Sequence, residues 1–190
     1  MIKIKWNNKT AVWLVRIILT LLCILMIAWI FSNSLKTGVQ SAEQSAQVTE
    51  GVKDAIETIK PDVEFGGSSE QENFDMLHSF VRNFAHFGEF ALLCALCTWC
   101  VLSYTAIKWF FLIPVPFCVG VAFFDEYLQT FSDGRAQELA DVMTDSLGAC
   151  TGFVFALLTI WLACVVVRLI QKKKNQSDVD RYEPTKENAE

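Results

Sequence analysis

The stretch AVWLVRIILTLLCILMIAWIF, residues 11–31, decides the class of fold. Its apolar run is interrupted by one charged side chain, Arg16, near its start. About 20 apolar residues in a helix cross the hydrocarbon core of a bilayer, which is about 30 Å thick, and a helix satisfies its own backbone hydrogen bonds there. The stretch therefore predicts a transmembrane helix. A cleaved signal peptide is disfavoured, because the run is longer than a usual signal core and no A-x-A-like site follows it.

Three further apolar blocks follow, at about residues 88–107, 109–124 and 146–167. A length of 190 residues would suit a single soluble domain, and 53% of the residues are hydrophobic. These residues nevertheless come in blocks, rather than with the short periods that soluble helices and strands show. We therefore expect an all-α, polytopic membrane protein with four transmembrane helices, whose membrane domain covers residues 11–170.

The connection between the first two spans carries a second helical pattern. Val48, Val52, Ile56 and Ile59 fall on one face of a helix that ends before Pro61. We expect this amphipathic segment to lie outside the cytoplasm, either along the membrane surface or packed on the bundle.

A new helix is predicted to begin shortly before the second block. Gly66 and Gly67 indicate a loop. Ser69 followed by Glu72 fits a capping box, so we expect a helix to start there and to run into the second span.

The basic residues predict the orientation, because Lys and Arg concentrate on the cytoplasmic side of membrane proteins. They precede the first span or open it, follow the second span and follow the fourth: Lys3, Lys5, Lys9, Arg16, Lys108, Arg168, Lys172, Lys173 and Lys174. Residues 32–82 instead hold nine acidic side chains against four basic ones. We therefore expect a cytoplasmic basic N-terminus at residues 1–10, a cytoplasmic polar tail at 171–190 that is disordered, and residues 125–145 outside.

This distribution also bears on partners and location. Anionic lipid headgroups account for the basic clusters, so we expect membrane lipids and no nucleic acid as partners. The predicted location is the cell membrane, with several spans.

All seven cysteines lie inside the apolar spans. Cys94, Cys97 and Cys100 follow a C-x-x-C-x-x-C spacing that resembles a metal or redox motif. No second pair of that kind occurs elsewhere, and cysteine packs well as a small hydrophobic residue. We therefore expect packing cysteines and no disulfide framework.

Polar side chains gather at the outer ends of three predicted spans. Arg82, His86 and Glu89 are spaced by four and three residues, so they share one helical face at the start of the second span. Asp125 and Glu126 end the short third span, whose roughly 16 apolar residues give only about 24 Å of helix.

The fourth span opens with acids that continue into a stripe of small residues. Asp141, Asp145, Gly148 and Gly152 are spaced by four, three and four residues, and small residues at this spacing suit close helix packing. The candidate polar site comprises Arg82, His86, Glu89, Asp125, Glu126, Gln129, Arg135, Asp141 and Asp145.

Each of these residues also has a plainer interpretation. Charged side chains in loops are usually solvated, which is the interpretation we adopt for Asp133 and Glu138. Asp125 and Glu126 adjoin apolar sequence, where acids are costly and face partners or a water-filled cavity. His78 lies in the preceding outer segment, and we assign it no role.

These groups are compatible with several chemistries. A histidine with carboxylates performs acid–base chemistry, and arginines bind a phosphate or carboxylate through paired hydrogen bonds. An oxygen-rich site with one histidine is also compatible with a metal ion, although we expect neither a metal nor another cofactor. No serine elbow, P-loop or H-E-x-x-H motif occurs.

Two motifs resemble those of the VanZ-like family, over about residues 25–155. The first reads Asp125-Glu126-x-x-Gln129-x-Phe131-x-x-Gly134-Arg135, followed by Asp141 and by Asp145-x-x-Gly148. The second reads Arg82-x-x-x-His86-Phe87-x-Glu89-Phe90, and Phe31-Ser32 with Ser41 and Ser45 is similar to a weaker early motif. The chain departs from the family pattern at Asn83, Glu138 and Asp145.

The resemblance implies a small bacterial envelope protein. The namesake of the family is linked to low-level resistance to teicoplanin-type glycopeptides. Our leading hypothesis is an outer-face site that binds or modifies an anionic envelope component, such as a lipid-linked cell-wall precursor or a glycopeptide-related ligand. Whether the protein is an enzyme stays open. The alternatives are an accessory protein held together by a structural salt-bridge network and, less favoured, an ion or solute transporter.

Overall fold

The computed structural model describes residues 9–59, 69–105 and 109–182, with side chains up to residue 178. These residues form α-helices, one short 3₁₀ helix and no strand, which confirms the predicted all-α class. The elements are α1 (Lys9–Ser34), α2 (Gly38–Ile59), α3 (Glu70–Tyr104), η1 (Phe110–Leu112), α4 (Pro114–Gln129) and α5 (Leu139–Tyr182). The predicted features at Lys3, Lys5, Pro61, Gly66, Gly67 and Lys108 lie outside the described residues.

Four helical segments are long and apolar enough to cross a membrane, as the four blocks predict. They cover Lys9–Ser34, Glu70–Tyr104, Phe110–Gln129 and Leu139–Asp178. Most apolar side chains along α1 and α5 are exposed, as expected for surfaces that contact lipid. The chain is therefore a multi-pass membrane protein.

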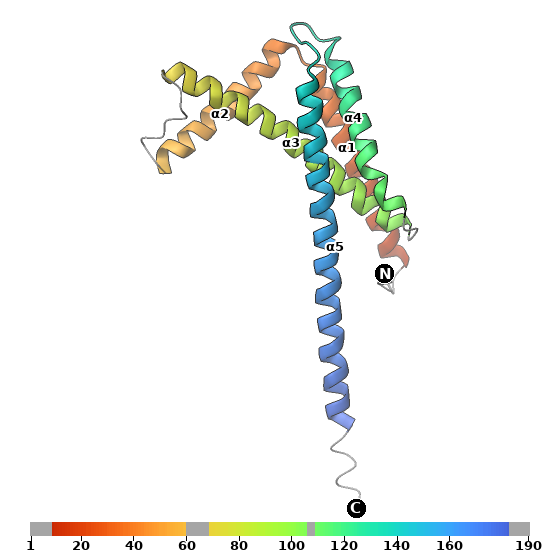
Figure 1. The fold of residues 1–190 in the computed structure, drawn as a ribbon. Helices are drawn as coiled ribbons and strands as arrows, with labels where there is room; N and C mark the ends of the chain where they lie inside the picture. Colours follow the sequence, from red (N-terminus) through yellow and green to blue (C-terminus); the bar gives the residue numbers. More distant parts are fainter. Residues whose placement is uncertain (1–8, 60–68, 106–108, 183–190) are drawn as a thin grey trace, which may run out of the picture.

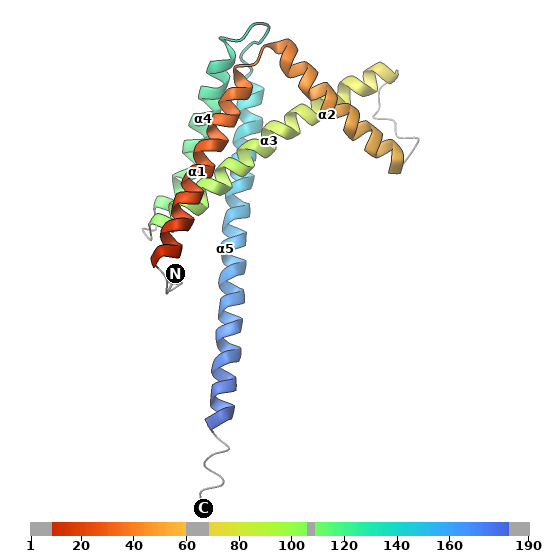
Figure 2. The same cartoon turned by 180° about the vertical axis from the view of Figure 1, so that it is seen from behind.

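The helices form a bundle with a projecting arm (Figures 1 and 2). α1 and α4 lie side by side, α3 crosses between α1 and α5, and α4 also packs directly on α5. α1 ends, α4 ends and α5 begins at one end of the bundle, which we call the site end. The first residue of α1 and the last of α5 lie toward the opposite end. This arrangement brings the termini of three helices together at one depth.

Small residues allow α5 to pack tightly on α3. A Cβ atom added at Gly148 would lie 2.3 Å from the carbonyl oxygen of Phe87, and one at Gly152 would lie 1.9 Å from that of Ala91. Both distances are far shorter than a van der Waals contact, so only glycine fits. The predicted small-residue stripe is confirmed as a helix-packing face.

The core lies where α1, α3, α4 and the first turns of α5 meet. Phe90, Leu93, Cys94 and Cys118 are fully buried there. The cysteines of the described residues carry free thiols, and several of them fill this core, as the packing interpretation predicts.

The arm consists of α2 and the first turns of α3. Ser69 caps α3, and its hydroxyl accepts a hydrogen bond from the Glu72 amide at 3.2 Å, which confirms the predicted helix start. The predicted amphipathic helix is α2, which packs on α3. An ion pair of 3.0 Å joins Lys53 of α2 to Glu70, the first residue of α3. Thr49 is the only fully buried side chain of α2 among the described residues.

The prediction of a disordered tail is wrong for residues 171–182, because α5 continues to Tyr182. No glycine or proline occurs between Phe153 and Tyr182, and the lysines and glutamines of this segment are good helix formers. The apolar block ends at residue 167, but no residue there ends the helix, so α5 continues into the polar sequence.

Candidate functional site

Three polar residues of α4 point into the bundle at its site end. Asp125, Glu126 and Gln129 are 1%, 0% and 2% exposed. The prediction that Asp125 and Glu126 end the third span is wrong, because α4 continues to Gln129 and the span covers 20 residues, Phe110–Gln129. Polar groups are tolerated in this last stretch because they face protein rather than lipid.

Asp125 is held from two sides. The hydroxyl of Ser34, at the end of α1, donates a hydrogen bond to Oδ1. The amide of Gln129, one turn further along α4, donates to Oδ2 at 3.1 Å. Ser132 donates to the Ser34 carbonyl at 2.9 Å, so the loop after α4 also closes on α1. These bonds fix the carboxylate of Asp125.

Glu126 joins α4 to the residue before α5. Its Oε2 accepts a hydrogen bond from the backbone amide of Glu138 at 2.8 Å. Its Oε1 is buried without a hydrogen-bond partner among the described residues. The side chain of Glu138 is exposed, as predicted, and so is that of Asp133. Glu138 thus takes part in the site through its backbone.

His86 of α3 faces Asp145 of α5. The distance from His86 Nδ1 to Asp145 Oδ1 is 3.8 Å, too long for a hydrogen bond. Asp145 is fully buried, and neither of its oxygens has a hydrogen-bond partner within the described part of the chain. A nitrogen of His86 and one oxygen each of Asp125 and Asp145 lie within 4.8 Å of one another, a spacing that a metal ion would suit.

The other two predicted residues of α3 have clear partners. Arg82 pairs with Asp141 of α5 at 3.3 Å, and their side chains are 41% and 13% exposed. Glu89 accepts hydrogen bonds from the Trp29 indole at 2.9 Å and from the Asn33 amide at 3.3 Å. α3 is therefore tied to both α1 and α5 at the level of the site.

Arg135 reaches the site from the connection between α4 and α5. Its guanidinium donates to the hydroxyl of Ser41, at the start of α2. Burial, followed by the charge of the nearby Arg82, lowers the pKa of Arg135 below its ordinary value. Arg135 forms no ion pair with a carboxylate within the described ranges. Two arginines therefore lie near each other, and one of them lacks a counter-charge in direct contact.

A close backbone contact positions this connection. The amide of Gly38 donates to the carbonyl of Asp133 at 2.9 Å. A Cβ atom at Gly38 would lie 2.6 Å from the Gly134 oxygen, and Gly134 has a φ of 76°, which favours glycine. The start of α2 and the loop that carries Arg135 are therefore held together.

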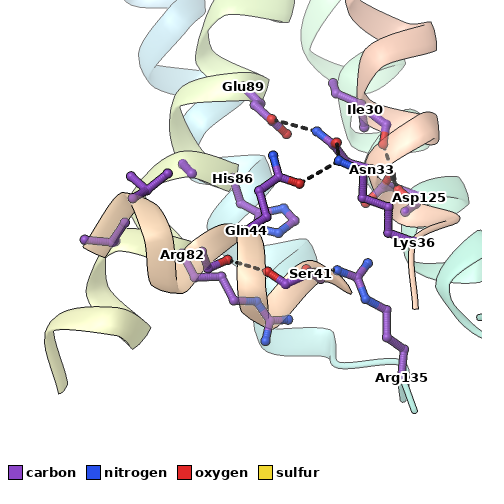
Figure 3. Close-up of a pocket in the computed structure, with 15 residues that line it drawn as sticks. Ile30, Asn33, Lys36, Ser41, Gln44, Arg82, His86, Glu89, Asp125 and Arg135 are labelled. Atoms are coloured by element: carbon purple, nitrogen blue, oxygen red, sulfur yellow. Dashed lines mark hydrogen bonds between the residues drawn. The ribbon is translucent and has the colours of Figure 1, made fainter. Parts of the chain in front are cut away.

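These side chains surround a cavity of about 120 Å³ that is partly open (Figure 3). Lys36, Arg82 and Arg135 line it, together with His86 and Asp125. Ser34, Asn33, Ser41, Gln44, Ser45 and Glu89 add further polar atoms to its wall. A second hollow, of about 190 Å³, adjoins it and shares Arg82, Arg135, Ser41 and Ser45.

The structure brings the nine predicted residues to one end of the bundle. Arg82, His86, Glu89, Asp125 and Arg135 line the first cavity, and Gln129 lines the second. Glu126, Asp141 and Asp145 lie around them as buried or half-buried partners. That these residues form a functional site stays a prediction.

Sequence reasoning missed the contribution of α1 and of the start of α2. Asn33, Ser34, Lys36 and Gln44 line the cavity, and Lys36 donates hydrogen bonds to Asn33 at 2.9 Å and to Gln44 at 2.6 Å. The signal available was the sequence Ser32–Lys36, in which polar residues follow directly on an apolar span. His78, which was assigned no role, lines the second hollow.

Fold and site together define a multi-pass helical membrane protein with a polar cavity at one end of its bundle. The chain belongs to the VanZ/LLP1 family, whose family model matches residues 18–171. No curated protein and no solved structure matches the chain.

Proposed function

We propose that the cavity binds an anionic group, most simply a phosphate, of a lipid-linked component of the cell envelope, and that this binding lowers susceptibility to teicoplanin-type glycopeptides. The observation that carries the proposal is the set of three basic side chains, Lys36, Arg82 and Arg135, that line the cavity and outnumber the two carboxylates in its wall, Glu89 and Asp125. Guanidinium groups bind phosphate oxygens through paired hydrogen bonds, and lysine adds a point charge.

The state of the two arginines supports an anion between them. Among the described residues, the guanidinium of Arg135 donates to the neutral hydroxyl of Ser41 and forms no ion pair. The charge of Arg82 lowers the pKa of Arg135, while the more distant carboxylates of Asp125, Glu126 and Asp141 raise it. The side chain of Arg82 is 41% exposed, so its guanidinium can bind an anion in the cavity while it stays paired with Asp141, whose side chain is 13% exposed. A bound phosphate would satisfy both guanidinium groups.

The proposal includes an orientation. The basic residues that flank the spans favour cytoplasmic termini, and the site end would then face outward. In that orientation the cavity would lie at the outer side of the membrane, where a lipid-linked precursor would present its polar headgroup.

The test compares Arg135→Ala with Asp133→Ala in cells that lack the native gene. Asp133 lies two residues away in the same connection, and its side chain is exposed. We expect the Arg135→Ala chain to lose the effect on teicoplanin susceptibility at equal protein abundance, and the Asp133→Ala chain to keep it. An unchanged susceptibility in Arg135→Ala, where deletion of the gene has a clear effect, contradicts the proposal.

A second function is favoured by the number of contacts that join the helices. Arg82–Asp141, Glu126–Glu138 and Ser34–Asp125 link different parts of the bundle. In that case the network is structural and the protein acts as an accessory or partner-binding membrane protein. Variants would then lose protein abundance and function together, whereas a binding site gives variants that accumulate normally without function.

A further inference from the structure

Three potential metal ligands converge in the wall of the cavity from three helices. His86 comes from α3, Asp125 from α4 and Asp145 from α5, and one ligand atom of each lies within 4.8 Å of the others. The His86 Nδ1 to Asp145 Oδ1 distance is 3.8 Å. Ligand atoms around a tetrahedral Zn²⁺ ion lie about 3.3 Å apart when each bond is about 2.0–2.1 Å. The His86–Asp145 pair is therefore about 0.5 Å wider than this spacing, and the widest pair, at up to 4.8 Å, is up to about 1.5 Å wider, a gap that rotation of the side chains about their χ angles would close.

The buried atoms of this group lack the partners that buried polar atoms normally have. Both oxygens of Asp145 and Nδ1 of His86 are buried and without a hydrogen-bond partner within the described residues. Asp145 is 0% exposed and its side chain is directed at His86. A buried carboxylate in its ionised form is strongly unfavourable unless it is paired with a cation or coordinates a metal ion.

The charge around the group is also unbalanced. The site contains five carboxylates, namely Glu89, Asp125, Glu126, Asp141 and Asp145, and three basic side chains, namely Lys36, Arg82 and Arg135. With all of these groups ionised, the surplus of two negative charges equals the charge of one divalent cation. The basic side chains lie at the cavity, and one of them, Arg82, is already paired with Asp141.

We propose that His86, Asp125 and Asp145 bind one divalent transition-metal ion. Imidazole nitrogen with two carboxylates is a ligand set that suits Zn²⁺ and Mn²⁺. Ser34 and Gln129 hold the carboxylate of Asp125 through hydrogen bonds, which is how metal ligands are commonly oriented. His86 and Asp125 also line the cavity, so the remaining coordination positions of the ion face the space that holds the proposed anion.

The test uses Co²⁺ as the probe on the full chain, purified in detergent and treated with a chelator. We expect one Co²⁺ per wild-type chain, with visible absorption bands of cobalt bound to nitrogen and oxygen. The thiolate charge-transfer band in the near ultraviolet should be absent. This band separates the proposed site from the cysteine cluster, in which the Cys23 and Cys97 sulfur atoms lie 3.8 Å apart.

The variants Asp145→Asn and His86→Gln should each bind Co²⁺ roughly tenfold or more weakly than the wild type. Asp133→Asn removes an exposed carboxylate at the same end of the bundle and should bind as the wild type does. Circular dichroism checks that each variant keeps its helical content. Where one of the two ligand variants does not fold, the other variant and the wild-type spectrum still decide the question.

Three outcomes overturn the proposal: a folded wild-type chain that takes up no stoichiometric Co²⁺, a thiolate band in its spectrum, or unchanged binding by folded Asp145→Asn and His86→Gln variants. Metal binding is measured here without any anionic ligand. Its failure is therefore distinguishable from failure of the proposed phosphate binding, which the Arg135→Ala comparison tests.

Discussion

The two oxygens of Glu126 have different surroundings: Oε2 accepts the Glu138 amide at 2.8 Å, and Oε1 is buried without a partner in the described part of the chain. Glu126→Ala leaves the Glu138 amide without its acceptor and opens a space, so we expect a loss of about 1–3 kcal/mol of stability. Glu126→Gln keeps an acceptor oxygen of the same shape and should lose much less.

Thermal unfolding in detergent, followed by circular dichroism, measures both variants. If Glu126→Gln unfolds as early as Glu126→Ala, the negative charge rather than the hydrogen bond holds this part of the structure. If Glu126→Gln is as stable as the wild type but no longer lowers teicoplanin susceptibility, the negative charge of Glu126 is required for function rather than for stability.

At the scale of residues, the sequence predicted which side chains gather better than it predicted their partners. The spacing of Arg82, His86 and Glu89 indicates a shared helical face because spacing fixes direction on a helix. The bond from Ser34 to Asp125 joins residues 91 positions apart. Such a pairing depends on how two helices align, and neither helix encodes that alignment alone.

The close contact between α3 and α5 depends on Gly148 and Gly152, and substitution of Gly152 tests it. Gly152→Ala places a Cβ atom 1.9 Å from the Ala91 carbonyl oxygen, which belongs to backbone and cannot rotate away. The helices must separate, and we expect a loss of about 1–3 kcal/mol, as for other overpacked cores. The lower thermal unfolding temperature in detergent measures this effect.

Gly88→Ala is the matched control. Gly88 lies in α3, next to Phe87, whose carbonyl contacts Gly148, yet a Cβ atom at position 88 meets nothing within 4 Å. Alanine is a better helix former than glycine, so this variant should be equal to the wild type or up to about 1 kcal/mol more stable. A stable Gly152→Ala variant, or equal losses in both, would show that the close α3–α5 contact is not required.

At the scale of elements, apolar blocks predicted the number and approximate place of the spans, but not where the helices end. α4 extends to Gln129 because its last polar residues face the interior of the bundle. A hydropathy profile shows that a residue is polar but not which way its side chain faces, so it placed the end of this helix too early. α5 extends to Tyr182 because polar helix formers continue it after the apolar residues end. Helix ends were predicted well where a cap defines them, as at Ser69.

The whole molecule has a predicted orientation that chemical labelling can measure. Asp133 lies at the site end, and Asn175 lies near the far end of α5. In intact cells, a membrane-impermeant maleimide should label an Asp133→Cys chain and leave an Asn175→Cys chain unlabelled until the membrane is permeabilised. The parent chain gives the background from its own cysteines. The reverse pattern would place the cavity on the cytoplasmic side.

α5 is far longer than a membrane crossing requires. Its 44 residues span about 66 Å, roughly twice the thickness of the hydrocarbon core. Figures 1 and 2 show that its second half runs beyond the other helices. With the predicted orientation, this half carries the basic residues Lys172, Lys173 and Lys174 past the lipid headgroups on the cytoplasmic side.

Two hydrogen bonds of the site join residues that lie far apart in the sequence. Ser34 and Ser41 bond to Asp125 and Arg135, at separations of 91 and 94 residues. At about 5–20 residues per second, a ribosome completes the first half of the site roughly 5 to 20 seconds before it completes the second. During that interval Ser34 and Ser41 have been synthesised but their partners Asp125 and Arg135 have not. The cavity is therefore expected to be among the last parts of the protein to form during synthesis.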